Sequence, residues 1–400
     1  MPRHHLSGRY SIVGLGVTPV GRVTGHSLLW NEVEAARLAI EDAGLERKDI
    51  GAALQALSDP GGGMRQRHDD AFPRVLGLPV KIYCENIGRG GEYAAMAIVT
   101  AMQLIELGVA NYVIVSGARD DWSRSRAIKK RGERGTGMAP RLGRWGHFYG
   151  STTAAVFHAL IASRHMALYG TKSEQLGRIA VAQREWACLD PEATMHGSPI
   201  TIEDYMNSPM VAEPYRLLDI CQQSDGGIAF IVTTTERAKD LKQKPVQILG
   251  IGFGEHMDHL LATGDHLTSL AVDTARDQAF SQADIKLSDV DVSELYDCFT
   301  GEVLFQIEGY GWCKKGEGGA FLDEGHLGPS GDLPINTGGG LLSGYHMGNL
   351  TGFAEGVRQI RGTCGARQVP DAEIALVTGH GGEILSGQMC SIHSSLILGR

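Results

Sequence analysis

The sequence predicts an α/β fold built from two similar halves. Apolar runs typical of buried strands alternate with stretches that carry apolar residues at helical spacing, and this alternation returns from residue 245 onward. With 400 residues, the chain is also too long for one simple core. These observations favour a duplicated fold with insertions over a single small domain.

The first half alternates strands and helices. Tyr10–Gly16 is an apolar run that ends in glycine, and residues 28–43 place apolar side chains at helical spacing before Gly44. Further strands are expected at 53–57, 79–84 and 112–117, and a helix at 92–107. Because these strands are apolar on both faces, we expect a mostly parallel sheet with helices on both sides.

Residues 119–235 interrupt this alternation and begin with a basic segment. Between Arg119 and Arg144, nine cations accompany three acidic residues, a local balance of +6 (9 − 3), although the whole chain has a net charge of −9. A mobile basic loop indicates a phosphate-bearing ligand, and a solvated loop without a partner is the alternative. The candidate contacts are Arg124, Arg126, Lys129, Lys130 and Arg131.

The second half repeats the first. Residues 246–252 match the strand at 10–16, and the pair Ala275-Arg276 repeats Ala36-Arg37. We therefore expect an amino-terminal half at 1–118, a loop domain at 119–235 and a carboxy-terminal half at 236–400. Chemistry is expected where the halves meet, on loops that follow strand ends.

Residues 338–349 are the most distinctive stretch of the chain. Five of the twelve are glycine, and they lie between an expected strand at 333–336 and an expected helix at 350–360. Such a turn brings the backbone close to a ligand, and His346 at its end is placed for acid/base work. The alternative is that the glycines only form the turn and His346 is a surface residue.

Composition narrows the functional class. The negative net charge argues against a general nucleic-acid binder, and the absence of an apolar run of about 18 residues argues against a membrane-spanning helix. The chain opens directly into a strand, so we expect no secretion signal. Seven cysteines, an odd number without metal-site spacing, indicate free thiols in a reducing cytoplasm and no bound metal.

Three stretches resemble the thiolase superfamily, and specifically its sterol-carrier-protein-type members. The stretches are His165–Lys172, Leu295-Tyr296-Asp297-Cys298-Phe299 and Gly340–Met347, and the resemblance covers nearly the whole chain. It implies two duplicated βαβαβ-type halves that form a layered α/β/α/β/α core with an inserted loop domain.

The resemblance also implies chemistry on coenzyme A thioesters. In the family, a cysteine thiolate attacks a 3-oxoacyl-CoA, and a second cysteine moves a proton at the α-carbon. Cys298 takes the place of that second cysteine, and His346 takes the place of the histidine that stabilises the enolate. Coenzyme A would be the co-substrate, and Gly344, His380 and Gly381 are further candidate contacts for it.

The nucleophile position departs from the family. It lies at the start of the helix expected at 92–107, where counting from the two flanking elements gives Ile87 or Gly91 instead of cysteine. Cys84, at the end of the preceding strand, is the nearest thiol. Either a longer loop brings Cys84 to the nucleophile position, or Cys84 is a buried strand cysteine and the acyl-enzyme chemistry is lost.

Three functions remain open at this point. The first is a thiolase that cleaves a bulky 3-oxoacyl-CoA, such as benzoylsuccinyl-CoA into benzoyl-CoA and succinyl-CoA, with Cys84 as nucleophile. The second is a retro-aldolase acting on a 3-hydroxyacyl-CoA, with Tyr296 and Tyr345 transferring protons. The third is a non-catalytic acyl-CoA-binding subunit. The retained pair Cys298 and His346 favours the first. The resemblance implies a homodimeric core and a small partner subunit with a zinc finger and an OB-fold.

Overall fold

Nine strands form one continuous mixed sheet in the computed structural model, which describes residues 4–23, 25–57, 71–85, 87, 91–130, 153–256, 268–269, 271–381 and 391–400. The strand order is β3-β2-β4-β7-β1-β8-β11-β10-β9. The first-half strands are β1 (Tyr10–Val17), β2 (Ile50–Leu57), β3 (Ile82–Cys84) and β4 (Tyr112–Asp120). β7 (Asp225–Thr234) comes from the end of the range expected as the loop domain and pairs with β1 and β4. The second-half strands are β8 (Val246–His256), β9 (Val292–Glu294), β10 (Ile374–Gly381) and β11 (Ser391–Gly399).

The expectation of a mostly parallel sheet was wrong. Only the pairs β2–β3, β2–β4 and β9–β10 are parallel, and the other pairs of the large sheet run antiparallel. Strands covered on both faces are apolar throughout whichever way their neighbours run. The apolar runs of β7 and β11 therefore contain no information about direction.

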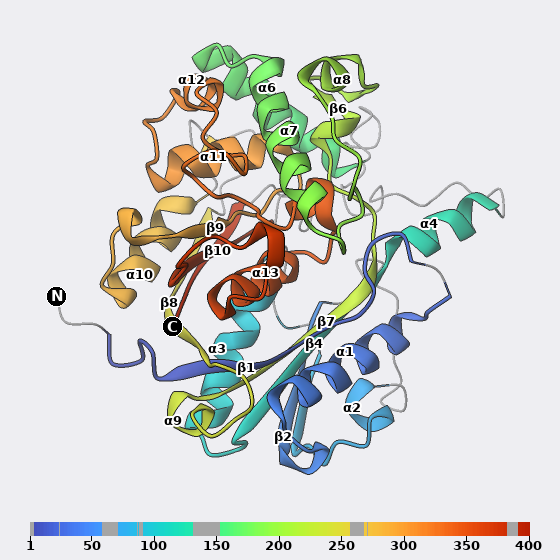
Figure 1. The fold of residues 1–400 in the computed structure, drawn as a ribbon, viewed down its shortest axis with the longest axis vertical. Coiled ribbons are helices and arrows are strands. Elements are labelled where there is room, and N and C mark those ends of the chain that lie inside the picture. Colours follow the sequence, from blue (N-terminus) through green and yellow to red (C-terminus); the bar gives the residue numbers. More distant parts are fainter. Residues whose placement is uncertain are drawn as a thin grey trace.

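Helices cover the sheet in layers, as the duplicated α/β/α/β/α prediction requires (Figure 1). The long helices are α1 (Leu28–Ala43), α3 (Tyr93–Glu106), α4 (Asp121–Lys130), α6 (Ala154–Tyr169), α7 (Ser173–Leu189), α10 (Val272–Ala283), α11 (Thr300–Tyr310) and α13 (Leu350–Arg361). Figure 1 shows α3 and α13 between the strands of the two halves, with α1 and α10 on the outer faces.

Short elements complete the described chain. The short helices are α2 (Phe72–Val75), α8 (Ile202–Asn207), α9 (Thr235–Ala238) and α12 (Gly318–Asp323), and the small second sheet pairs β5 (Met210–Ala212) with β6 (Tyr215–Arg216). Single turns of helix lie at η1 (Arg47–Asp49), η3 (Leu217–Asp219), η5 (Leu287–Asp289), η6 (Gly340–Gly344) and η7 (Gly365–Arg367). Within the described residues, no helix is both long enough and apolar enough to cross a membrane.

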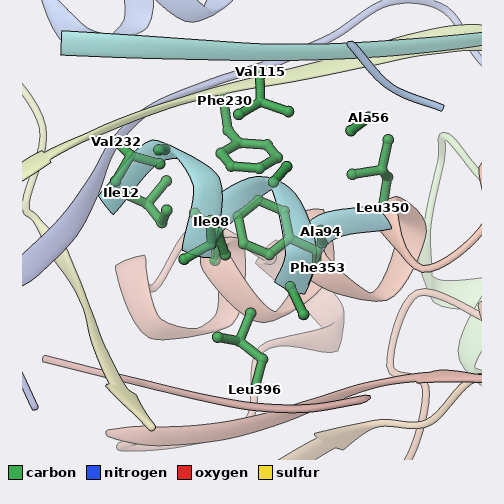
Figure 2. Packing of buried hydrophobic residues seen from close by; sticks show 14 of the residues in the cluster. Ile12, Ala56, Ala94, Ile98, Val115, Phe230, Val232, Leu350, Phe353 and Leu396 are labelled. Atoms are coloured by element: carbon green, nitrogen blue, oxygen red, sulfur yellow. The ribbon is translucent and has the colours of Figure 1, made fainter. Parts of the chain in front are cut away.

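The central layer holds the main hydrophobic core. Phe230 of β7 and Phe353 of α13 pack with their ring centroids 4.4 Å apart. Figure 2 shows Ile98 of α3 beside Phe353, with Val115 on the first-half side and Leu396 on the second-half side. Each such side chain contributes roughly 1.5–3 kcal/mol by leaving water. This packing fixes both central helices relative to both halves.

The duplication is visible in how the outer helices contact the sheet. An added Cβ at Gly16 of β1 would lie 2.1 Å from the carbonyl oxygen of Ala35 on α1. In the second half, an added Cβ at Gly252 of β8 would lie 1.9 Å from the carbonyl oxygen of Ala275 on α10. Only glycine permits this approach of helix to strand, so both halves use the same packing device.

Candidate functional site

A buried carboxylate holds the glycine-rich turn η6 in place. The backbone N–H groups of Leu341 and Leu342 donate to Asp297 at 2.9 and 3.1 Å. At Gly340 φ is +57°, and an added Cβ would lie 2.2 Å from an Asp297 oxygen, so only glycine allows this contact. Burial raises the pKa of Asp297 to about 7, against the lowering effect of these hydrogen bonds. Asp297 thus fixes the turn that leads to His346.

His346 follows this turn and is neutral. Its backbone N–H donates to Ser224 Oγ at 2.8 Å, and its Nδ1 lies 3.8 Å from Cys221 Sγ. Its Nε2 is buried and has no hydrogen-bond partner among the described residues. Burial, and then the charge of Arg119, lower the pKa of His346 to about 3. If the thiol donates to Nδ1, then Nε2 carries the proton and can donate to a substrate oxygen.

Two cysteines lie on neighbouring backbone segments beside the turn. The N–H of Cys221 donates to the carbonyl oxygen of Cys298 at 3.0 Å. Burial, and then the charge of Asp297, raise the pKa of Cys221 to about 12. Cys298 is 9% exposed and packs in the hydrophobic cluster of the second half. The Cys221 thiol thus contacts His346, and its raised pKa keeps it protonated at neutral pH.

Tyr296 lies just after the end of β9. Its backbone N–H donates to Thr378 Oγ1 on β10 at 2.8 Å, and the side chain is half-buried. Burial and the neighbouring Cys298 raise the pKa of Tyr296 well above its usual value, while Arg119 acts in the opposite direction. The phenol is therefore protonated at neutral pH and is available as a proton donor.

Arg119 places a fixed positive charge near His346 and Tyr296. It lies at the end of β4, and its Nη1 donates to Asp121 Oδ2 at 2.7 Å. The same carboxylate pairs with Arg124. Tyr93, the first residue of α3, is near enough to Arg119 and Tyr296 to influence the pKa of each. The described site thus combines one guanidinium, one neutral imidazole and two phenols.

The start of α3 presses directly against β10. An added Cβ at Gly91 would lie 2.0 Å from the carbonyl oxygen of His380, and one at Gly379 would lie 1.9 Å from the carbonyl oxygen of Gly91. The N–H of Ala94 donates to Asn349 Oδ1 at 3.2 Å, which ties the two central helices together. A cysteine side chain has no room at position 91. None of residues 87–92 (Ile-Gly-Arg-Gly-Gly-Glu) is a cysteine.

Cys84 ends β3, the edge strand of the sheet. Its side chain is half-buried and packs against the central hydrophobic cluster. Residues 88–90, which connect β3 to α3, lie outside the described residues. A nucleophilic role for Cys84 stays a prediction.

The basic segment begins as a helix instead of a loop. The carboxylate of Asp225 on β7 accepts from the N–H groups of Trp122 and Ser123 at 2.9 and 3.1 Å, which satisfies the first turn of α4. Arg124 pairs with Asp120 and Asp121 at the same end. Figure 1 shows α4 projecting from the body of the molecule.

The predicted coenzyme A contacts on α4 divide into two groups. Arg126, Lys129 and Lys130 are exposed, and the guanidinium of Arg126 lies 4.9 Å from the ring centroid of Trp122. Arg124 is half-buried in its ion pairs. Arg131 lies outside the described residues. The exposed cations form a surface that suits phosphate groups.

Among the remaining predicted site residues, His380 lies beside the converging side chains, with its ring centroid 6.5 Å from that of Tyr296. Tyr345 is 3% exposed and packs in the central cluster, with Arg358 and Glu192 as its charged neighbours. His380 is fully buried, and its Nε2 lies 3.3 Å from Glu302 Oε2. Gly344 and Gly381 are buried as well. Within the described ranges, no cluster of three His, Cys, Asp or Glu side chains could hold a metal ion.

Sequence reasoning missed Arg119, Tyr93 and Cys221 as site residues. Arg119 ends a strand and Tyr93 begins a helix, which are the positions where chemistry is expected in such sheets. Cys221 lies just before β7, which begins at Asp225. These positions could have marked the three residues as candidates. Each residue is far in sequence from His346, so no local motif joins it to the site.

Comparisons with known proteins show the family and the fold of this chain. A family model described as "Thiolase C-terminal domain-like" matches residues 254–400. The 17-hydroxy-3-oxo-4-pregnene-20-carboxyl-CoA lyase of Mycobacterium tuberculosis is 35% identical, over 96% of this chain and 99% of that protein. The benzoylsuccinyl-CoA thiolase subunit BbsB of Thauera aromatica is 31% identical, over 94% of this chain and 96% of that protein. The solved structure of an "Ltp2-ChsH2(DUF35) aldolase" has a TM-score of 0.85 at 33% identity and covers 98% of both chains.

Proposed function

Because the chain belongs to the thiolase superfamily, we propose that it cleaves a 3-hydroxyacyl-CoA by a retro-aldol reaction. The name of the mycobacterial lyase describes a steroid with a hydroxyl on carbon 17 and a CoA-activated carboxyl on carbon 20. That hydroxyl lies on the carbon β to the thioester, as a retro-aldol cleavage requires. The substrate class proposed for this chain is therefore a CoA thioester with a ring-bound β-hydroxyl.

The start of α3 is the observation that carries the proposal. In thiolases the nucleophilic cysteine opens this helix, but here neither Ile87 nor Gly91, the two counted positions, is a cysteine, and an added Cβ at Gly91 would lie 2.0 Å from the carbonyl oxygen of His380. Thiolysis needs an acyl-enzyme, whereas a retro-aldol cleavage needs only proton transfer and enolate stabilisation. The site lacks the cysteine that thiolysis needs at this position. It keeps groups that can transfer a proton and stabilise an enolate, which retro-aldol cleavage needs.

The proposed proton transfers run through Tyr296. The phenol oxygen accepts the proton of the substrate hydroxyl while the C–C bond breaks, and the phenol delivers its own proton to the α-carbon. The O–H electrons form the ketone, and the electrons of the C–C bond form the enolate that is then protonated. Because burial raises the pKa of Tyr296, a relay that never leaves a lasting phenolate suits this residue.

His346 is proposed to stabilise the enolate. Its Nε2 lacks a partner among the described residues, and its lowered pKa keeps the ring neutral. A neutral imidazole N–H stabilises a developing oxyanion by hydrogen bonding and does not give up its proton permanently. Coenzyme A would then take part only as the thioester group of the substrate, and no free coenzyme A would be consumed.

The exposed cations of α4 are proposed to bind the coenzyme A phosphates. Arg126, Lys129 and Lys130 provide the charge, and Trp122 holds Arg126 in place. A homodimeric core and a partner subunit with a zinc finger and an OB-fold remain part of the proposal. The name of the solved aldolase joins Ltp2 to ChsH2(DUF35), which supports a two-component assembly.

CoA-dependent thiolysis is the second candidate. The contact between Cys221 and His346 favours it, because a cysteine beside a histidine is the usual arrangement of an activated thiol. The raised pKa of Cys221 and the lowered pKa of His346 count against it, since together they favour the neutral pair.

Product analysis separates the two candidates. The protein, with any subunit that copurifies, would be given a CoA thioester bearing a ring-bound β-hydroxyl, without free coenzyme A. We expect one ketone and one shorter acyl-CoA per substrate by mass spectrometry, with Cys84→Ala as active as the wild type. A strict requirement for free coenzyme A, or an acyl group trapped on Cys84 or Cys221, would refute the proposal.

A further inference from the structure

Arg119 is directed at the reacting centre by the register of β4. Side chains two residues apart on a strand share a face, so Val115, Gly117 and Arg119 point the same way. Figure 2 shows Val115 directed toward the central helices. An added Cβ at Gly117 would lie 2.9 Å from Leu350, the first residue of α13. Arg119, one step further along, therefore faces the region where α3 and α13 begin.

The guanidinium is held but not fully satisfied. Its Nη1 donates to Asp121, and the side chain is 13% exposed. Its Nε is buried and has no hydrogen-bond partner among the described residues. The residue opposite on β7 is Gly226, which has no side chain to cover Arg119 on that face. A buried donor without a partner is destabilising, and a bound acceptor would remove this cost.

The surroundings of Arg119 place it beside His346 and Tyr296. Its charge contributes to the lowered pKa of His346 and opposes the raised pKa of Tyr296. The charged groups near His346 are Arg119 and Asp121, and the carboxylate of Asp121 is already engaged by Arg119 and Arg124. Arg119 Nε and His346 Nε2 are thus both buried without a hydrogen-bond partner among the described residues, and the charge of Arg119 acts on His346.

We propose that Arg119 is a catalytic residue whose Nε–H, together with the Nε2–H of His346, donates to the thioester oxygen as the enolate forms. The electron pair released from the C–C bond moves into the enolate, and negative charge accumulates on that oxygen. Arg119 transfers no proton, because a guanidinium stays protonated in proteins. Asp121 holds the planar group through Nη1, which leaves the buried Nε to donate to the substrate.

This inference deepens the proposed function but depends on it only for the identity of the substrate. An acyl-CoA enolate forms in both retro-aldol cleavage and thiolysis. The exchange of α-protons of acetyl-CoA or propionyl-CoA with D₂O therefore measures enolate formation without either complete reaction. Exchange tests Arg119, and cleavage of the hydroxyacyl-CoA tests the proposed function.

The experiment compares wild type with Arg119→Met and Arg119→Lys. Loss of one fixed oxyanion donor lowers rates by about 10²–10³-fold, so we expect this decrease in α-proton exchange while acyl-CoA binding stays within about 2-fold. Arg119→Lys keeps the charge but not the planar donor, and it should recover only part of the rate. Added guanidinium should partly restore exchange in an Arg119→Ala variant.

Arg37→Met is the matched control, because Arg37 is also an ion-paired arginine but lies on α1 with Glu34 and Glu41. It should exchange at the wild-type rate. Exchange by Arg119→Met within about 3-fold of wild type, or no exchange by wild type, would overturn the inference. If Arg119→Met does not fold, a folded Arg119→Lys variant with wild-type exchange would overturn it equally. If the wild type exchanges α-protons but does not cleave the hydroxyacyl-CoA, the proposed retro-aldol function is refuted, but the proposed role of Arg119 is not.

Discussion

Replacing Gly91 by alanine should both destabilise the protein and slow its reaction. The added Cβ would lie 2.0 Å from the carbonyl oxygen of His380, whereas real contacts of this kind do not fall below 3.0 Å. The start of α3 must therefore move away from β10 by at least about 1 Å (3.0 − 2.0). Both partners are backbone atoms of regular elements, so no side-chain rotation can relieve the overlap.

The magnitude follows from this forced movement. Overpacking a closely fitted core costs about 1–3 kcal/mol, and the rigidity of both backbones places this case near 3 kcal/mol. Tyr93 and Ala94 move with α3, and a 1 Å misplacement of reacting groups costs roughly 10²-fold in rate. Urea unfolding measures the first effect, and the cleavage rate at saturating substrate measures the second.

Two further variants test the reasoning. In Gly356→Ala on α13, the nearest atom is a methyl group of Val377 at 2.8 Å, which can shift, and helix propensity gains up to about 1 kcal/mol, so stability should hardly change. In Gly379→Ala on β10, the added Cβ would lie 1.9 Å from the carbonyl oxygen of Gly91, so it forces apart the same two backbone segments. The losses of folding stability in Gly91→Ala and Gly379→Ala should therefore not add in the double variant. Wild-type stability and activity in Gly91→Ala would refute the reasoning.

The other predictions concern individual side chains. Tyr296→Phe should lower the cleavage rate by about 10²–10⁴-fold while acyl-CoA binding, measured by calorimetry, is unchanged. Asp297→Ala leaves two buried N–H groups of the turn unpaired and should lower the free energy of unfolding by about 3 kcal/mol in urea titrations. Charge reversal at Lys129 and Lys130 should raise KM by roughly 10-fold at low salt and less at high salt. Because folding lowers the pKa of His346 from 6.5 to about 3, its stabilising contribution is complete above pH 6.5 and is lost as pH falls toward 3. His346→Gln should therefore make the free energy of unfolding less dependent on pH in that range.

Local sequence patterns predicted an α/β fold with two similar halves, and the resemblance to the thiolase superfamily implied its layered core. The glycine-ended strands and the repeated Ala-Arg pair indicated the duplication, and the contacts of Gly16 and Gly252 with their outer helices show why both halves need glycine there. Strand direction was not predictable, since doubly covered strands are apolar in either orientation. The helix α4 was also missed, because the carboxylate that satisfies its first turn comes from Asp225, 103 residues after Trp122.

The site was predictable where it is local and not where it is assembled from distant segments. His346 and Tyr296 lie within short motifs, so their positions followed from the sequence. The contact between Cys221 and His346 joins residues 125 positions apart, and no local sequence pattern predicts it. The main functional interpretation gave most weight to Cys298 beside His346 and favoured thiolysis. The similarity to the mycobacterial lyase and the solved aldolase supports the retro-aldol alternative instead.

The two reactions differ less than their names suggest, and the site geometry shows where the difference lies. Both break a bond between the α- and β-carbons of an acyl-CoA and leave an enolate on the thioester side. Thiolysis must attack a β-ketone with a thiolate, whereas retro-aldol cleavage must only deprotonate a β-alcohol. If His346 and Arg119 hold the enolate in both reactions, a change from one reaction to the other needs different residues only around the β-carbon. Gly91 leaves no room for a cysteine side chain, and in the proposed reaction Tyr296 would make the proton transfer that the alcohol requires.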